Sequence, residues 1–576
     1  MEYIGALLLF LLPGALAALV HTHCTKREAF PHWLVLWIVY ALVIDLLLSL
    51  LRLLHGTGSR GLVESFVSAS SFFKYGMAAV AMAVALPLAF VWLNRFLARH
   101  PIKWKWKPPI VFTSDIDATT HTQEGSPSRN APLHQVLGVG VLFVGGVVLG
   151  VALLMGVYAL PSGRVVENVK SSAVLIEAEG AYPTFVDGYK STLLDSWSDS
   201  IMLLMAARVP KEGLLQESML SYYMRYSQGA IKPREGLLLW SKGERLDEIV
   251  DLSYARYWHG YLVVLKPLLT FLNYYQIRVV NTVASTMMFL LLLVLMWCKG
   301  LSRYLVPALV MIAFLTPPYL FWCLQYAPSL HVMLIASLAL LLGFRWLKRK
   351  QAFHLFFMAT GMAAAYFDIL SYPIASLAIP LLFFALMDPS KNWKVSLRDS
   401  LVLSVFWAIG YGGMWSAKWV LATVFTGKDI IQDAMNNILN RTSTVWLGVK
   451  FTKLQAVLKN LQMLMHWPYL LAFCAPLLVY LAAIMKKRTA LDNGKLVIEW
   501  DTTRFLNVLV PFGFVALLAP AWYLLTSNHC YANASFTHRA LAGTAFALLS
   551  MFARFAIRDR AAAVGKAEDE RRAVPE

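Results

Sequence analysis

Long runs of apolar residues recur along the chain, many of them close to the length of a membrane-spanning helix. A helix needs roughly 20 mostly apolar residues to cross the hydrocarbon core of a bilayer. This criterion predicts about thirteen spans, at 3–21, 34–52, 75–94, 134–160, 277–297, 304–322, 330–344, 354–370, 372–387, 400–423, 468–485, 505–525 and 539–556. The expected fold is therefore an all-α, polytopic transmembrane helix bundle.

Two polar intervals divide this pattern into domains. Residues 108–133 are rich in Pro, Ser, Thr and Asp and are typical of a linker, which separates a three-span N-terminal membrane module (1–107) from a ten-span core (134–556). The second interval, 161–258, is predicted to be a long outer loop of the core, and loops of this length are usually functional. The small, polar residues 557–576 are expected to form a cytoplasmic tail.

The long outer loop contains segments with helical periodicity. In 195–209 the apolar residues recur at helical spacing after a favourable N-cap, and 214–226 interleaves apolar and polar residues. Both are expected to be amphipathic helices in the membrane interface, with a small soluble domain packed on itself as the alternative. The aromatic and basic stretch 254–268 is expected to lead into the next span at the headgroup level.

Composition agrees with a membrane protein. Of 576 residues, 58% are apolar and 15% are charged, whereas soluble domains carry about a quarter charged residues. The net charge of +18 would suggest a nucleic-acid partner in a soluble protein, but membrane proteins concentrate Lys and Arg in cytoplasmic loops. The five Cys are scattered without a CxxC pair and predict neither a disulfide framework nor a zinc site.

Loop charge predicts the orientation. Basic residues gather in alternate loops, at 26–27, 95–107, 299–303, 345–350, 391–398 and 486–488, and the loops between them at 323–329 and 526–537 contain none. The N-terminus is therefore expected outside and the C-terminus in the cytoplasm. The membrane is expected to be a bacterial plasma membrane. Because Glu2 replaces the basic start of a signal peptide, residues 1–21 are expected to be a span.

Carboxylates in the outer loop are candidate general bases. Asp195 and Asp199 are four residues apart and would share one face of a helix, where mutual repulsion can raise a pKa. The alternative is that Asp195 caps a helix and Asp199 favours its N-terminal end. Glu179 and Asp187 flank a turn-like stretch and are further candidates.

Ionisable residues near the membrane surface are candidates for substrate binding. Asp368 lies at the outer end of the span 354–370, and Lys418 lies between two Trp residues, where it could bind phosphate or extend to the interface. Arg256 and His259 precede the span 277–297, and Arg256 could pair with a phosphate.

The last outer loop, 528–539, combines amides, imidazoles and a guanidinium between two apolar spans. Its candidate residues are Asn528, His529, His538 and Arg539. A phosphate site built on Arg539 is favoured over a metal site, since Arg matches phosphate geometry and the His spacing alone is weak support for metal. No metal or other cofactor is therefore predicted, although a divalent metal stays possible. Motifs for nucleotide binding, metalloprotease chemistry and esterase chemistry are absent, and nothing predicts nucleic-acid binding.

These features resemble the GT-C superfamily of integral membrane glycosyltransferases, and in particular its bacterial envelope-glycan members. The resemblance covers about 134–556 and rests on the acidic loop after 134–160, the lead-in YWHGYLVVLKPLL, Asp368 followed by Pro373, and the closing NHCYANASFTHR. The loop lacks the paired Asp-Asp or Asp-Glu that several subfamilies show just after this span, so the resemblance singles out no base.

The resemblance implies a transferase that moves a sugar from a polyprenyl phosphate to an envelope glycan or a lipid-linked acceptor on the outer face, with inversion. It implies that Asp195 or Asp199 deprotonates the acceptor, while Arg539, Lys418 or Arg256 holds the phosphate. The partners would be the polyprenyl-phosphate-linked sugar, the glycan acceptor and the lipid bilayer. A lipid-linked glycan polymerase or ligase, and a transporter or flippase, are the alternatives.

Overall fold

The computed structural model describes residues 131–556, except 228, 230, 318, 389–391, 493–494 and 499–501. The N-terminal module expected at 1–107, the linker up to residue 130 and the tail at 557–576 lie outside the described residues.

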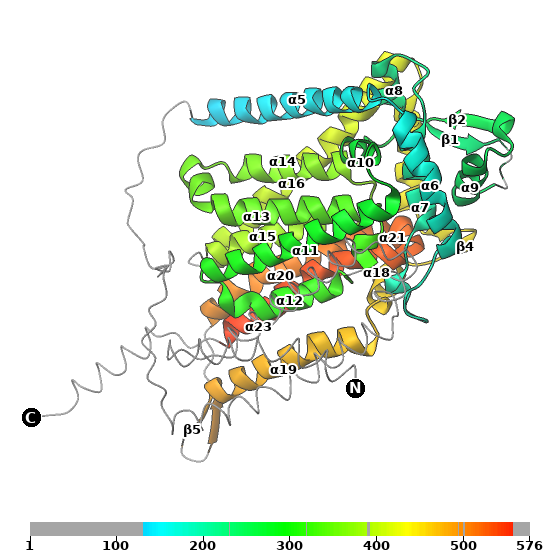
Figure 1. Cartoon of the computed structure of the whole chain (residues 1–576). Helices are drawn as coiled ribbons and strands as arrows, with labels where there is room; N and C mark the ends of the chain where they lie inside the picture. Colours follow the sequence, from blue (N-terminus) through cyan, green and yellow to red (C-terminus); the bar gives the residue numbers. More distant parts are fainter. Residues whose placement is uncertain are drawn as a thin grey trace, which may run out of the picture.

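A bundle of long helices makes up most of the described chain, and the helices run side by side in Figure 1. Each of the ten intervals predicted as core spans contains one helix. They are α5 (Ala131–Tyr158), α11 (Tyr274–Cys298), α12 (Leu305–Phe314), α13 (Ala327–Lys350), α14 (Phe353–Phe367), α15 (Ala375–Met387), α16 (Trp393–Thr426), α19 (Trp467–Arg488), α20 (Thr502–Leu525) and α23 (Leu541–Phe555).

Six of these helices are long and apolar enough to cross a membrane: α5, α11, α13, α16, α19 and α20. Helices α12, α14 and α15 are apolar but shorter. The protein is thus a mostly helical, membrane-embedded bundle, whereas the count of thirteen spans stays a prediction.

The fraction of buried residues differs between the helices and shows which of them lie at the centre of the bundle. In the most apolar stretch of α13, 61% of residues are buried, compared with 11% in α5 and none in α19. The apolar surfaces of α5 and α19 that the described residues leave uncovered are compatible with a lipid environment.

Two glycines allow α14 and α16 to approach closely. A Cβ on Gly361 would lie 2.1 Å from the backbone oxygen of Trp407, and a Cβ on Gly410 would lie 2.1 Å from that of Met358. Small residues of this kind let helix backbones meet inside a membrane.

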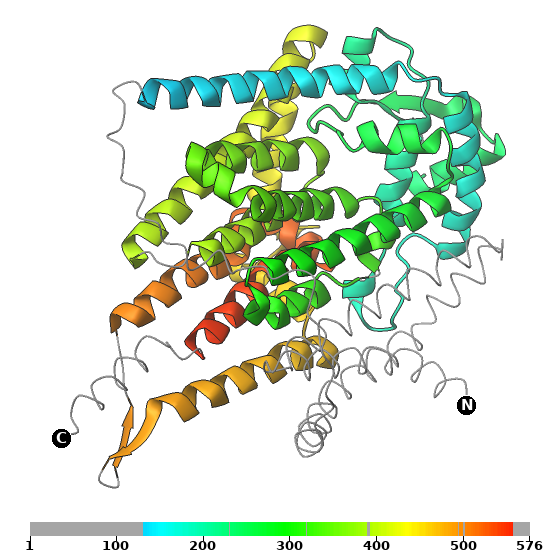
Figure 2. The same cartoon turned by 60° about the vertical axis from the view of Figure 1, so that its left-hand side comes forward.

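The chain between α5 and α11 folds into a cap at one end of the bundle (Figures 1 and 2). Its elements are α6 (Gly163–Glu179), η1 (Lys190–Thr192), α7 (Ser196–Ala207), α8 (Leu214–Leu220), β1 (Tyr223–Tyr226), α9 (Pro233–Lys242), η2 (Leu246–Glu248), β2 (Ile249–Leu252) and α10 (Leu262–Leu269). Strands β1 and β2 are antiparallel, with Tyr223 opposite Leu252.

Short elements complete both ends of the bundle. Near the cap lie α17 (Ile430–Thr442), β3 (Val445–Trp446), β4 (Val449–Lys450), α18 (Lys453–Gln462), α21 (Ser527–Ala532), α22 (Ala534–Thr537) and the turn η5 (His538–Ala540). The hairpin of β5 (Thr489–Asp492) and β6 (Lys495–Ile498) extends from α19 at the opposite end. Two further turns, η3 (Ser302–Tyr304) and η4 (Tyr319–Trp322), flank α12.

The expectation of interfacial helices in the cap is wrong for 195–226. Helix α7 buries nine of its twelve residues and packs against α6, α9 and β1, so it has no free apolar face to place in lipid. The segment 214–226 is helical only to Leu220 and continues as β1. The alternative, a small domain packed on itself, describes this part of the cap better.

The aromatic lead-in at 254–268 also differs from the prediction. Tyr257, Trp258 and Tyr261 are buried, and the Trp258 indole donates a hydrogen bond to the Met414 carbonyl of α16 at 2.7 Å. These rings fasten the cap to the bundle, because their hydrogen-bonding groups find partners inside the protein rather than at lipid headgroups.

Candidate functional site

Asp199 is fully buried in α7, and the chain after η4 supplies most of its hydrogen bonds. Its carboxylate accepts the backbone N–H groups of Leu324 at 2.9 Å and Gln325 at 3.0 Å, and the Cys323 thiol at 3.3 Å. The Tyr274 hydroxyl donates a fourth bond. With both oxygens occupied, Asp199 positions the connection 323–326 that leads into α13.

A second buried network extends from this carboxylate. Arg278 of α11 donates to the Tyr274 hydroxyl, and its other nitrogen pairs with Glu179 at 2.6 Å. The guanidinium also lies over the Tyr274 ring, 4.0 Å from its centre. Glu179 is thus bound to an arginine that joins α6 to α11, and Arg278 is a residue that the sequence analysis missed.

Asp195 caps the N-terminus of α7, as the alternative interpretation of this residue expected. It accepts the Ser198 N–H at 3.0 Å and the Ser198 hydroxyl at 2.7 Å. Burial raises the pKa of Asp195 to about 6. The hydrogen bonds from Ser198 lower this pKa in part, and the nearby Asp199 carboxylate raises it. Asp187, the fourth predicted base, is exposed on the cap.

Asp368 follows the last residue of α14 and is buried. One carboxylate oxygen accepts the Ser371 N–H at 2.9 Å, and the other has no hydrogen-bond partner. The Ser371 hydroxyl donates to the Gln325 carbonyl at 3.0 Å, which places Asp368 beside the same connection 323–326.

Arg539 lies on another side of this connection and is fully buried. Its guanidinium donates to the carbonyls of Leu315 at 3.2 Å, Ser535 at 3.1 Å and Ser191 at 3.2 Å. It also stacks over Tyr326, 4.3 Å from the ring centre. Arg539 therefore joins its own loop to two distant segments, and its N–H groups are directed to protein carbonyls.

Asp199 and Arg539 thus contact one connection, the buried residues 323–326, and Asp368 is linked to it through Ser371. Their contacts are mostly with the protein itself, so this cluster holds the cap, α14 and α23 together. The exception is the unpartnered oxygen of Asp368.

The other predicted binding residues have structural partners. The Lys418 ammonium is buried and donates to the Ser218 carbonyl at 2.6 Å, so it neither reaches the interface nor faces solvent. His259 donates from Nε2 to the Tyr254 carbonyl at 2.9 Å and accepts the Tyr261 hydroxyl at Nδ1, and burial lowers its pKa to about 3.

The last outer loop is helical rather than extended. Asn528 donates to the Ser443 hydroxyl at 3.1 Å and to the Val445 carbonyl, which fixes the chain after α17. His538 is fully buried, donates from Nδ1 to the Ala534 carbonyl at 3.0 Å, and has no partner at Nε2.

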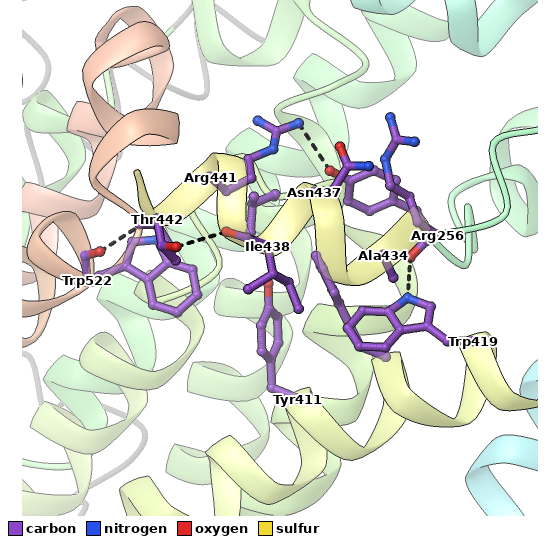
Figure 3. A pocket seen from close by; sticks show the side chains of 13 residues that line it. Arg256, Tyr411, Trp419, Ala434, Asn437, Ile438, Arg441, Thr442 and Trp522 are labelled. Atoms are coloured by element: carbon purple, nitrogen blue, oxygen red, sulfur yellow. Dashed lines mark hydrogen bonds between the residues drawn. The ribbon is translucent and has the colours of Figure 1, made fainter. Parts of the chain in front are cut away.

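A pocket of about 110 Å³ lies at the capped end of the bundle, between α16, α17 and α20 (Figure 3). It is lined by Arg256, Tyr257, Leu370, Tyr411, Trp415, Trp419, Ala434, Asn437, Ile438, Arg441, Thr442, Trp522 and Thr526. Aromatic rings form its walls, and two guanidinium groups are its only cations. The pocket therefore suits a ligand with an apolar body and an anionic group.

Arg441 has only neutral partners in the part of the chain that the structure describes. Its guanidinium donates to Nδ1 of His529 and to the Tyr257 hydroxyl at 3.3 Å. Because His529 also donates from Nε2 to the Leu370 carbonyl at 2.7 Å, it is the neutral imidazole, and burial next to Arg441 lowers its pKa well below the usual value. The positive charge of Arg441 is thus not neutralised by a carboxylate.

Arg256 is the second cation of the pocket. It pairs with the half-exposed Asp433 at 3.2 Å and lies over the Tyr254 ring, 4.6 Å from its centre. Its Nε and the indole nitrogen of Trp415, another lining residue, are buried without hydrogen-bond partners. Buried donors usually have partners, so these two indicate a missing acceptor.

Leu370 connects the pocket to Asp368. Its φ of +72° is unusual for a branched residue, and strain of this kind tends to be kept at functional sites. His529 holds the Leu370 carbonyl, and Asp368 lies two residues earlier in the chain.

Of the residues predicted from the sequence, Arg256 lines the pocket, and His529 contacts the lining residue Arg441. Arg441 was not among the residues predicted from the sequence. The amphipathic pattern of 430–442 could have indicated Arg441, which is the only Lys or Arg in this stretch and follows several Asn residues.

No metal-binding group of three His, Cys, Asp or Glu residues occurs among the described residues. In comparisons with protein-family models, curated proteins and solved structures, nothing matches this chain.

Proposed function

We propose that the protein is a membrane glycosyltransferase that uses a polyprenyl-phosphate-linked sugar at the capped end of the bundle, and that this end faces outward. The observation that carries the proposal is the pocket in which Arg441, without a carboxylate partner, meets walls of Trp and Tyr. A lipid-linked phosphate has the matching chemistry, because its anionic group suits the guanidinium and its prenyl chain suits the aromatic walls.

The location of the pocket also supports a lipid ligand. Helix α16, which forms one wall, is a candidate membrane span whose residues Val420, Val424 and Phe425 are exposed. A donor dissolved in the bilayer could therefore reach the pocket laterally, without passing through water.

Asp368 is the best-placed general base for this reaction. Asp199 has both oxygens occupied, Asp195 caps a helix, and Glu179 is paired with Arg278. Asp368 keeps one carboxylate oxygen without a hydrogen-bond partner in the described chain, and a general base needs such an oxygen to accept a proton.

In the proposed reaction the acceptor hydroxyl gives its proton to Asp368 while its oxygen attacks the anomeric carbon. The bond from that carbon to the phosphate oxygen breaks, and its electron pair stays with the phosphate. Arg441 and Arg256 stabilise the charge that develops there. Attack opposite the leaving group inverts the anomeric centre.

Binding is tested with the full chain in lipid nanodiscs and farnesyl phosphate as the probe. Arg441→Gln should weaken binding about ten- to hundredfold, since hydrogen bonds to charged groups contribute about 1.5–3 kcal/mol. Arg164→Gln removes an exposed guanidinium elsewhere on the cap and should bind as the wild type does. Equal affinity of Arg441→Gln and wild type would contradict the phosphate site.

Transfer is tested by mass spectrometry of envelope glycans from cells that produce the wild type, Asp368→Asn or Asp195→Asn at equal levels. Loss of one sugar substituent in Asp368→Asn alone, with farnesyl phosphate still bound in vitro, is the expected result. Loss in Asp195→Asn alone would move the base to Asp195. Glycans that change in length rather than substitution would favour the polymerase or ligase, and unchanged glycans would favour transport.

A further inference from the structure

The chain between α16 and α19, residues 427–466, leaves apolar side chains uncovered at the capped end. This segment contains α17, the hairpin of β3 and β4, and α18, and we refer to it as the outer platform. Its exposed apolar residues are Ile431, Met435, Leu439, Val445, Trp446, Leu447, Val449, Leu454, Leu458 and Met465. A contiguous exposed apolar surface usually marks an interaction site.

Helix α17 presents three different faces around its circumference. Ala434, Ile438 and Arg441 point toward the pocket (Figure 3). Ile431, Met435 and Leu439, spaced four residues apart, form an adjoining apolar stripe that is exposed. The polar residues Gln432, Asp433, Asn436 and Asn440 form a third face that is also exposed. An exposed apolar stripe beside an exposed polar face is the pattern of a helix that lies in a membrane surface.

The hairpin and α18 continue the apolar stripe. Leu447, at the tip of the hairpin, is 82% exposed and has a φ of +50°, so the turn directs an apolar side chain away from the protein. In α18, Leu454 and Leu458 are exposed one helical turn apart, whereas Ala456 and Val457 are buried.

The charge of the platform and its direct connection to two candidate spans indicate that lipid covers this surface. Lys428, Lys450 and Lys453 are exposed among these apolar residues, and the platform has an excess of basic over acidic residues. The platform also joins α16 to α19, two candidate spans with exposed apolar surfaces. Lysines beside inserted leucines can extend their ammonium groups to anionic headgroups.

We propose that the outer platform lies in the boundary between headgroups and acyl chains of the outward-facing leaflet, with a preference for anionic lipid. Its apolar stripe is inserted into the bilayer, and the pocket-facing side of α17 opens from that depth. The platform thus determines the depth at which an anionic lipid meets Arg441. This inference concerns lipid contact and does not depend on sugar transfer, although it places the entry of the proposed donor.

The test is spin labelling of the full chain in vesicles of phosphatidylglycerol and phosphatidylcholine. Single cysteines replace Leu439, Leu447 or Leu454, with Asn436→Cys on the polar face of α17 as the matched control. Cys24, Cys298 and Cys474 are first changed to Ser, while Cys323 and Cys530 are buried and stay. The readout compares collisions of each label with oxygen, which concentrates in lipid, and with a water-soluble nickel chelate.

The three leucine positions should favour oxygen over nickel by severalfold, and Asn436→Cys should show the reverse. Nickel accessibility at the leucines equal to that at Asn436→Cys overturns the proposal, because the platform would then be in water. Protection from both agents also overturns it, since a protein surface would cover the stripe. Equal depth in vesicles without phosphatidylglycerol overturns the preference for anionic lipid.

Farnesyl phosphate binding by the same labelled proteins separates the two proposals. Insertion of the leucines without any binding of the probe would contradict the proposed function and leave the platform in the membrane. Binding of the probe without insertion would contradict the platform alone.

Discussion

At the scale of single residues, burial and hydrogen bonding distinguish aspartates that the sequence alone offers equally as candidate site residues. Asp199 has four donors, Asp195 caps α7, and Asp368 keeps one oxygen free. A carboxylate whose oxygens are both bound by protein donors is occupied by the architecture, whereas one with a free buried oxygen can still accept a proton. The chemistry of each group therefore follows from its partners rather than from its residue type.

Asp195→Asn should change stability in a way that depends on pH. The pKa of Asp195 is raised from 3.8 to about 6 in the folded protein, so the stability linked to its protonated form is complete below about pH 4 and is lost as the pH rises through 6. Asn also caps helices well. We expect equal melting temperatures of variant and wild type at pH 4, and a higher one for the variant at pH 8.

Thermal unfolding in detergent, followed by intrinsic fluorescence at both pH values, measures this difference. Asp187→Asn, which changes an exposed carboxylate, is the control and should match the wild type throughout. A variant that is less stable at pH 8 than the wild type would show that Asp195 is held as a carboxylate.

At the scale of elements, hydropathy locates helices better than it locates their ends. Helix α16 begins at Trp393, seven residues before the predicted span, because a helix continues through polar residues once it leaves the apolar layer. Helix α12 ends at Phe314, well before residue 322, in a stretch that contains the pair Pro317–Pro318. Neither the close contact of α14 with α16 nor the burial of α7 is visible in hydropathy.

Gly361→Ala should destabilise the bundle, since its methyl group would lie 2.1 Å from a backbone oxygen of α16 and the helices would have to separate. Overpacking of this kind costs about 1–3 kcal/mol. Gly412→Ala, on α16 with no atom within 4 Å of the new methyl, should be as stable as the wild type or slightly more so. Melting temperatures in one detergent compare the two, and equal losses would rule out the close contact as the cause.

At the scale of the whole molecule, the bundle has two different ends. The cap, the outer platform and the pocket lie at one end, and the basic loop between α13 and α14 lies at the other (Figure 1). Basic loops are retained in the cytoplasm, which is the basis for placing the cap outside.

Cysteine labelling in intact cells tests this orientation. Asp247→Cys on the cap should react with a membrane-impermeant maleimide from outside, whereas Arg349→Cys, just after the apolar part of α13, should react only after permeabilisation. Both variants are made without Cys24, Cys298 and Cys474. The reverse pattern would place the pocket in the cytoplasm and remove the proposed outer-face reaction.

The sequence by itself determined that this protein is a helical membrane bundle and where its core helices lie. Hydropathy is a local property, and a run of apolar residues must form a helix in lipid because the backbone has no other hydrogen-bond partners there. The sequence also limited the candidate chemistry to a few ionisable residues in the outer loops.

Only the tertiary structure decided which of those residues form a site. The partners of Asp199 at residues 323–325 lie 124 to 126 residues further along the sequence, and Arg441 and His529 are 88 residues apart. Such pairings depend on how helices pack, which no local pattern contains. The folded chain therefore assigned Asp199 and Arg539 to the architecture and brought Arg256 and Arg441 to one pocket near Asp368, because the partners that each side chain meets are a property of the packed molecule.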